Sequence, residues 1–155
     1  MGCDGARGGE VAVRLAIAAL VLAAGALPIH AEPTRGEQEH RFFAALEAVE
    51  GAQGSRDHGH AYGPLQIHHG YWSDAVDQCP DLRVDHWQAW VSHRAYARLV
   101  VAAYMRRHAP VAWKRGDWAT CAAIHNAGVR GVAKGRGKAY ARRVIALMTA
   151  EKGPA

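Results

Sequence analysis

Two acidic residues, Glu50 and Asp57, have a spacing that could support a shared chemistry. Glu50 closes an apolar stretch that is expected to be helical, so the negative end of the helix dipole and partial burial should both raise its pKa. A carboxylic acid of this kind can protonate a glycosidic oxygen when a second carboxylate stays ionised nearby. Asp57 could be that carboxylate, or a solvated residue of a polar loop. Glu47 is the competing acid, one turn earlier on the same stretch.

The residues that follow this pair could hold a sugar. Gly63 and Pro64 predict a tight turn. Gln66 carries an amide that could bind a sugar amide or the acid itself, although a glutamine here could also lie on the surface. Tyr71 and Trp72 have flat faces on which pyranose rings can stack, unless they are core aromatics.

Histidines flank the same stretch at His58, His60, His68 and His69. Imidazoles suit zinc and copper, but none of these spacings matches a helical metal-binding pair with a carboxylate base. We therefore expect no metal and no cofactor. These histidines are expected to be polar loop residues that could tune activity below about pH 6.5, where imidazoles become charged.

The elements that must position these residues are predicted to be helices around one irregular polar stretch. In the first helix, Phe42, Phe43, Leu46 and Val49 have the spacing of one buried face. Residues 51–62 are predicted to form turns or a small hairpin. The fold class is therefore α+β and mostly α. The predicted helices cover residues 37–50 (ended by Gly51), 70–78, 86–108 (capped by Asp85 and stopped by Pro110), 117–124 (ending near 126–128) and 139–150.

The N-terminal residues 1–31 are predicted to be a signal peptide rather than part of the fold. Arg7 and Arg14 precede an uncharged apolar run over 15–29, which is short for a membrane span. An uncleaved N-terminal anchor is the alternative. Cleavage would leave 32–155 as one domain, secreted or periplasmic, with no stable membrane insertion.

Export changes the interpretation of the cysteines. Cys3 leaves with the signal peptide, and Cys79 and Cys121 remain in an oxidising compartment. We predict a disulfide between them; two unpaired buried thiols are the alternative.

Composition limits the class of protein. The chain has 155 residues, of which 50% are hydrophobic and 21% charged, which excludes a disordered chain and most multi-domain machines. Its net charge of +5 favours anionic partners. Basic residues gather near the C-terminus, either as a solvated helix face or as an attraction for anionic polymers. They are Lys134, Arg136, Lys138, Arg142 and Arg143.

Short motifs taken together, in their order, resemble the lysozyme-like superfamily. The resemblance covers about residues 41–147 and is closest to invertebrate-type lysozymes, which carry an acid Glu, a following Asp, a Gly-x-x-Gln-Ile turn and a Tyr-Trp-x-Asp segment. Asn126-Ala127-Gly128 together with Tyr140-Ala141 equally resembles the goose-type lysozymes and the lytic transglycosylases. The matching segments are Val49-Glu50-Gly51, Asp57 to Ile67, Tyr71-Trp72-Ser73-Asp74, Asn126-Ala127-Gly128 and Tyr140-Ala141.

This resemblance implies a lysozyme-like fold, with a small irregular or β-hairpin lobe beside a helical lobe. It implies a monomeric muramidase-like glycosidase that acts on peptidoglycan or a related amino-sugar polymer and binds no nucleic acid. Glu50 would be the general acid and Asp57 the nucleophile or water-activating base. Tyr62, Gln66, His125 and Asn126 would line the cleft, together with Tyr71.

Three departures keep the reaction type open. Gly51 follows the acid where serine is common, most half-cystines of the invertebrate enzymes are missing, and the gap from Asp57 to Gly63 matches the goose-type spacing. Lytic transglycosylases need no second acid and close an anhydro ring, whereas the presence of Asp57 favours hydrolysis. A catalytically silent protein that binds glycan is the third alternative.

Overall fold

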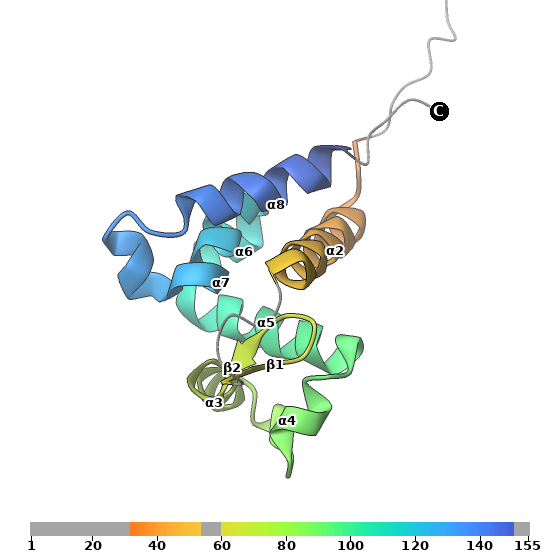
Figure 1. Ribbon diagram of the computed structural model, residues 1–155, viewed down its shortest axis with the longest axis vertical. Helices are drawn as coiled ribbons and strands as arrows, with labels where there is room; N and C mark the ends of the chain where they lie inside the picture. The colour runs from red at the N-terminus through yellow and green to blue at the C-terminus, as the bar shows by residue number, and fades with distance from the viewer. Residues whose placement is uncertain (1–31, 54–59, 151–155) are drawn as a thin grey trace, which may run out of the picture. The chain divides into compact units, whose positions relative to one another are not determined.

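The computed structural model describes residues 32–53 and 60–150, which are mostly helical (Figure 1). These residues also include a two-stranded antiparallel sheet, so the mostly α class with a small non-helical element is confirmed. The predicted signal peptide over 1–31 and the predicted second acid, Asp57, lie outside the described residues.

Helix α2 (Arg35–Gln53) places Glu50 near its C-terminal end. It begins with a capping box: the Thr34 N–H donates to the Glu37 carboxylate at 2.7 Å, and the Glu37 N–H donates to the Thr34 hydroxyl at 3.3 Å. The predicted helix over 37–50 is confirmed, but the predicted end at Gly51 is wrong, because α2 continues to Gln53. A glycine inside a helix costs only about 1 kcal/mol, which tertiary packing readily offsets.

A short hairpin follows, with β1 (Ala61–Tyr62) paired antiparallel to β2 (Ile67–His68). The tight turn predicted at Gly63 is confirmed: Gly63 has φ +73°, and its carbonyl accepts the Gln66 N–H at 3.1 Å. A Cβ atom on Gly63 would lie 2.0 Å from the carbonyl oxygen of Val91. The hairpin turn therefore packs directly on the backbone near Val91.

The single helix predicted over 86–108 is wrong. Over these residues the chain forms two helices, α4 (Trp87–Trp90) and α5 (Arg94–His108). The helix predicted over 70–78 is confirmed as α3 (His69–Gln78), and the 3-10 turn η1 (Pro80–Leu82) follows it. His86, in the left-handed region at φ 53°, precedes α4, so Asp85 does not cap a long helix. The interruption between α4 and α5 contains Val91, which is fully buried against the hairpin turn. The interruption between α4 and α5 therefore lies where the chain packs on the hairpin, and the periodicity of the local sequence does not indicate it.

The C-terminal part contains α6 (Pro110–Arg115), α7 (Trp118–Ala133) and α8 (Lys138–Ala150). Pro110 ends α5 as predicted and also begins α6, which the sequence analysis did not predict. Asp117 accepts the Thr120 N–H at 3.0 Å, which confirms it as the start of α7. Gly128 breaks the helical geometry with φ 64° and ψ 167°, but one more helical segment runs to Ala133, beyond the predicted end near 126–128.

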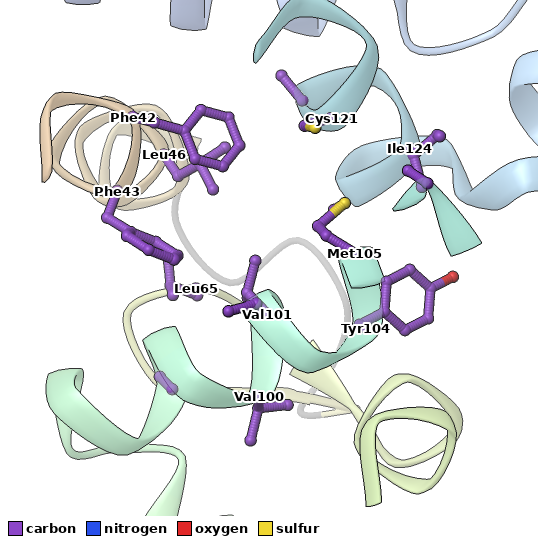
Figure 2. Packing of buried hydrophobic residues seen from close by; sticks show 14 of the residues in the cluster. Phe42, Phe43, Leu46, Leu65, Val100, Val101, Tyr104, Met105, Cys121 and Ile124 are labelled. Carbon is purple, nitrogen blue, oxygen red and sulfur yellow. The ribbon is translucent and has the colours of Figure 1, made fainter. Parts of the chain in front are cut away.

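Helix α5 supplies much of the hydrophobic core. Figure 2 shows Phe42, Phe43 and Leu46 of α2 on the same side of the core as Leu65, with α5 and α7 beyond them. Helix α5 packs against α3 and α7, and α8 packs against α7 and α2. This arrangement brings the end of α2 close to α7 and α8. Buried residues of α5 include Val100, Val101, Ala102, Ala103, Tyr104 and Met105.

The predicted disulfide is not formed in the structure, in which Cys79 and Cys121 are both free thiols. Cys79 is half-buried where α3 ends, whereas Cys121 is fully buried on α7. Burial raises the pKa of Cys121 to about 12, so this thiol is unreactive at neutral pH. Over the described ranges, none of the helices is both long and apolar enough to span a membrane.

Candidate active site

Glu50 is held in a half-enclosed position at the end of α2. Its side chain is 12% exposed, because the preceding turns of α2 are anchored in the core through Leu46 and Val49. Burial raises the pKa of Glu50, although a hydrogen bond from Tyr140 and the charges of Arg143 and His68 partly offset this effect. A carboxyl group with a raised pKa keeps its proton to higher pH than an ordinary glutamate does.

Tyr140 of α8 is the direct partner of Glu50. Its hydroxyl donates to Glu50 Oε1 at 2.6 Å, and its side chain is buried. Burial and then the nearby Glu50 charge raise the pKa of Tyr140, so the phenol stays protonated and remains a donor. The hydrogen bond orients the carboxyl group and favours its anion once the proton has left.

His125 of α7 is the second neighbour of Glu50. Its Nε2 lies 3.7 Å from Glu50 Oε1, and its side chain is 4% exposed. Burial lowers the pKa of His125 to about 4, against the effect of a hydrogen bond with the Leu65 backbone, which favours the charged form. His125 is therefore neutral near pH 7, and its approach to Glu50 is not an ion pair.

Tyr71 of α3 extends this group away from Glu50. Its hydroxyl lies 3.2 Å from Nδ1 of His125. Its ring stacks on Tyr104 of α5, with centroids 3.6 Å apart and planes inclined at 14°. One face of Tyr71 is therefore occupied by protein, which removes that face from the predicted stacking on a sugar. Tyr71 instead fixes the position of His125.

One arginine and one histidine lie near the carboxyl group. His68 is exposed on β2, Arg143 is exposed on α8, and the charge of each favours the anion of Glu50. The Arg143 guanidinium also lies 5.6 Å from the centre of the Tyr140 ring. The partly exposed acid thus has positive charge beside it, which suits an anionic substrate.

The competing acid, Glu47, is occupied by ion pairs. Its Oε1 lies 2.8 Å from Nη2 of Arg98, and its Oε2 lies 3.3 Å from Nε of Arg94. Its side chain is 12% exposed, as for Glu50, so burial does not distinguish the two acids. Their partners do: Glu47 is paired with two guanidinium groups, whereas Glu50 lies beside a phenol and a neutral imidazole.

The structure brings together Glu50, His125 and Tyr71 of the predicted site residues. Asn126 is the exposed residue next to His125 on α7. Gln66, at φ 47°, donates its side-chain amide to the Gly63 carbonyl at 3.0 Å, so this donor is used to close the hairpin turn. Tyr62 is half-buried with its ring edge-on to Trp87.

The sequence analysis did not identify Tyr140 as a site residue, although it lay within a segment that carried the resemblance. It also missed the aromatic contacts of Trp87 and the exposed ring of Trp90. Trp72 stacks on Trp87 at 5.6 Å, and Trp90, which is 48% exposed, lies 5.8 Å from the ring of Tyr96. The sequence signal for these side chains was the spacing of Trp87 and Trp90, three residues apart in the helix predicted over 86–108.

Within the described residues, no three His, Cys, Asp or Glu side chains gather in a way that could hold a metal ion. Comparisons with protein-family models, curated proteins and solved structures found no match. The geometry around Glu50 and the motif resemblance are therefore the basis for the function proposed below.

Proposed function

We propose that this chain is an exported, muramidase-like glycoside hydrolase with a lysozyme-like fold. It would cleave β-1,4 bonds between amino sugars of peptidoglycan, with Glu50 as the general acid. The observation that carries the proposal is a half-enclosed carboxyl group with a raised pKa, bound by one phenol and next to a neutral imidazole. Proton donors of glycosidases require such an environment.

In the proposed reaction, Glu50 protonates the glycosidic oxygen as the bond to the leaving sugar breaks. The carboxylate that forms is then stabilised by the Tyr140 hydroxyl at 2.6 Å and by the charges of Arg143 and His68. His125 stays neutral and does not hold Glu50 permanently as an anion. Asp57 is proposed to offset the oxocarbenium charge, as nucleophile or as the base for a water molecule.

Positive charge and aromatic side chains also support the proposed substrate. Positive charge near Glu50 and the net charge of +5 favour an anionic wall polymer. Trp87 and Trp90 offer indole rings held by other aromatic residues, and Trp90 is 48% exposed. Such rings can stack on the apolar face of a pyranose. Export through residues 1–31 would bring the enzyme to this substrate, as a secreted or periplasmic monomer.

The test compares clearing of a bacterial cell-wall suspension by wild type, Glu50→Gln and Glu47→Gln. Glu50→Gln should lower the rate by about 10²–10⁴-fold, the usual contribution of a general acid. Glu47→Gln makes the same chemical change one turn earlier and should retain the clearing activity of folded protein. It should instead lower the stability, because it leaves the half-buried Arg98 without its carboxylate partner.

Equal clearing by wild type and Glu50→Gln would contradict the acid assignment. A folded wild type that binds the wall but clears nothing would favour a silent glycan-binding protein. Mass analysis of released fragments distinguishes the two reactions: reducing ends indicate hydrolysis, and anhydro ends indicate lytic transglycosylation.

A further inference from the structure

A pocket lies between α7 and α8, and it includes neither Glu50 nor His125. Its volume is about 650 Å³, within the usual range for small-molecule sites. Helix α8 therefore contributes to both sites: Tyr140 contacts Glu50, whereas Ala141 and Ile145 line the pocket. The apolar lining consists of Ala119, Ala123, Val132, Ala141, Ile145 and Ala146.

The local sequence explains why the two helices leave this space. Four of the apolar lining residues are alanines, whose short side chains do not fill the groove between helices. At one end of the groove α8 lies close to α7, because Gly137 has φ +81° and its Cα lies against the backbone of α7. A Cβ atom on Gly137 would lie 2.7 Å from the Ala123 carbonyl oxygen. Glycine here lets the start of α8 approach α7, while the alanines keep the groove open beyond that point.

Three cations also line the pocket: Arg136, Lys138 and Arg142. All three are exposed, and none has a carboxylate partner in the part of the chain that the structure describes. They belong to the C-terminal basic group of the sequence, and the site around Glu50 does not use them. An apolar groove with unpaired positive charges is complementary to a molecule that has an apolar body and an anionic head.

We propose that this pocket binds a single-chain anionic amphiphile, such as an alkyl phosphate or a fatty acid, as a monomer. The lining favours an alkyl chain over a peptide, because the peptide's amide groups would need polar partners. Thr120 has the only neutral polar side chain in the lining, and its hydroxyl already donates to Asp117 at 2.6 Å. The cations bind the head group, and the alanine-rich groove takes the chain. This inference does not depend on the proposed glycosidase activity.

The first measurement is calorimetric titration of the full chain with dodecyl phosphate below its critical micelle concentration. We expect saturable binding of one equivalent. Decyl phosphate should bind about 15-fold more tightly than octyl phosphate, since it has two more methylenes and each buried methylene contributes about fourfold. A nonionic amphiphile of equal chain length should bind at least about tenfold more weakly, and inorganic phosphate should not bind measurably.

Variants separate this pocket from general attraction of anions. Replacing Arg136, Lys138 and Arg142 with glutamine should weaken dodecyl phosphate binding by about tenfold or more, with a few-fold loss for each charge. The matched control replaces Lys114, Arg130 and Lys134, three exposed cations outside the pocket, and should change the affinity by less than about threefold. Ala146→Trp should abolish binding by filling the groove, while the thermal unfolding midpoint remains near that of wild type.

Four results would overturn the proposal. These are no saturable binding by wild type, no dependence on chain length, equal losses in the two triple variants, and full binding by a folded Ala146→Trp. Binding only to vesicles that contain an anionic lipid, without binding of the monomer, would also overturn it. That outcome would indicate attraction to a charged membrane surface instead of a site for one molecule.

Discussion

Replacing Tyr140 with phenylalanine tests the environment of Glu50 most directly. The substitution removes the hydroxyl that donates to Glu50 Oε1 at 2.6 Å and keeps the buried ring in place. The hydrogen bond favours the anion of Glu50, opposite to the effect of burial. Its loss should therefore raise the pKa of Glu50 beyond the wild-type value.

The size of the effect follows from the geometry. A hydrogen bond to a charged group contributes about 1.5–3 kcal/mol, and about 1.4 kcal/mol corresponds to one pH unit. Because the Glu50 side chain is only 12% exposed, water can replace the lost donor only in part. We expect the titration of Glu50 to move upward by about one to two pH units in Tyr140→Phe.

Two assays measure this shift. Carbon NMR of the Glu50 carboxyl group reports its titration without requiring activity. Initial rates of wall clearing against pH should show the alkaline limb moving upward by the same amount. Tyr104→Phe is the matched control, since Tyr104 is also buried but stacks on Tyr71 without bonding to Glu50. An unchanged Glu50 titration in Tyr140→Phe would refute the argument that this phenol stabilises the anion.

Two further predictions concern stability. Gly63→Ala should lower the free energy of unfolding by at least about 2 kcal/mol in urea titrations, because its Cβ would lie 2.0 Å from the Val91 oxygen at φ +73°. Gly70→Ala is the control, with no atom within 4 Å of the added Cβ, and an equal loss there would contradict the steric reasoning. The buried neutral His125, with its pKa near 4, should make stability fall by about 3 kcal/mol as the pH drops through the interval from about 6.5 to 4, where the unfolded state binds the proton more strongly. His125→Gln in a Glu50→Gln background should flatten the dependence in that interval, and an unchanged slope would show that His125 is not held neutral.

Local sequence was sufficient to predict most of the helices. The spacing of Phe42, Leu46 and Val49 predicted α2, and the Asp117 cap predicted the start of α7. These signals work because a helix buries one face at a period of 3.6 residues and must satisfy its first N–H groups locally. The sequence also indicated Glu50, since the helix dipole and partial burial both raise the pKa of an acid at the C-terminal end of an apolar helix.

Long-range packing decided the features that the sequence analysis missed. The break between α4 and α5 lies where Val91 meets the hairpin turn at Gly63, a contact that no local periodicity reveals. Cys121 is enclosed as a free thiol on α7, although the predicted export of a chain that keeps two cysteines led to the prediction of a disulfide.

The partners of Glu50 belong to the same class of long-range contacts. Its phenol comes from Tyr140, ninety positions further along the chain, and its imidazole comes from His125 on another helix. Residue types alone could name an acid, but the desolvation that raises its pKa depends on which distant helices cover it. The same holds for Glu47, whose partners Arg94 and Arg98 both come from α5. The sequence thus determined which helices form and which acids were available, whereas the packing of α5, α7 and α8 around α2 decided which acid lies beside a phenol and an imidazole and which lies beside two guanidinium groups.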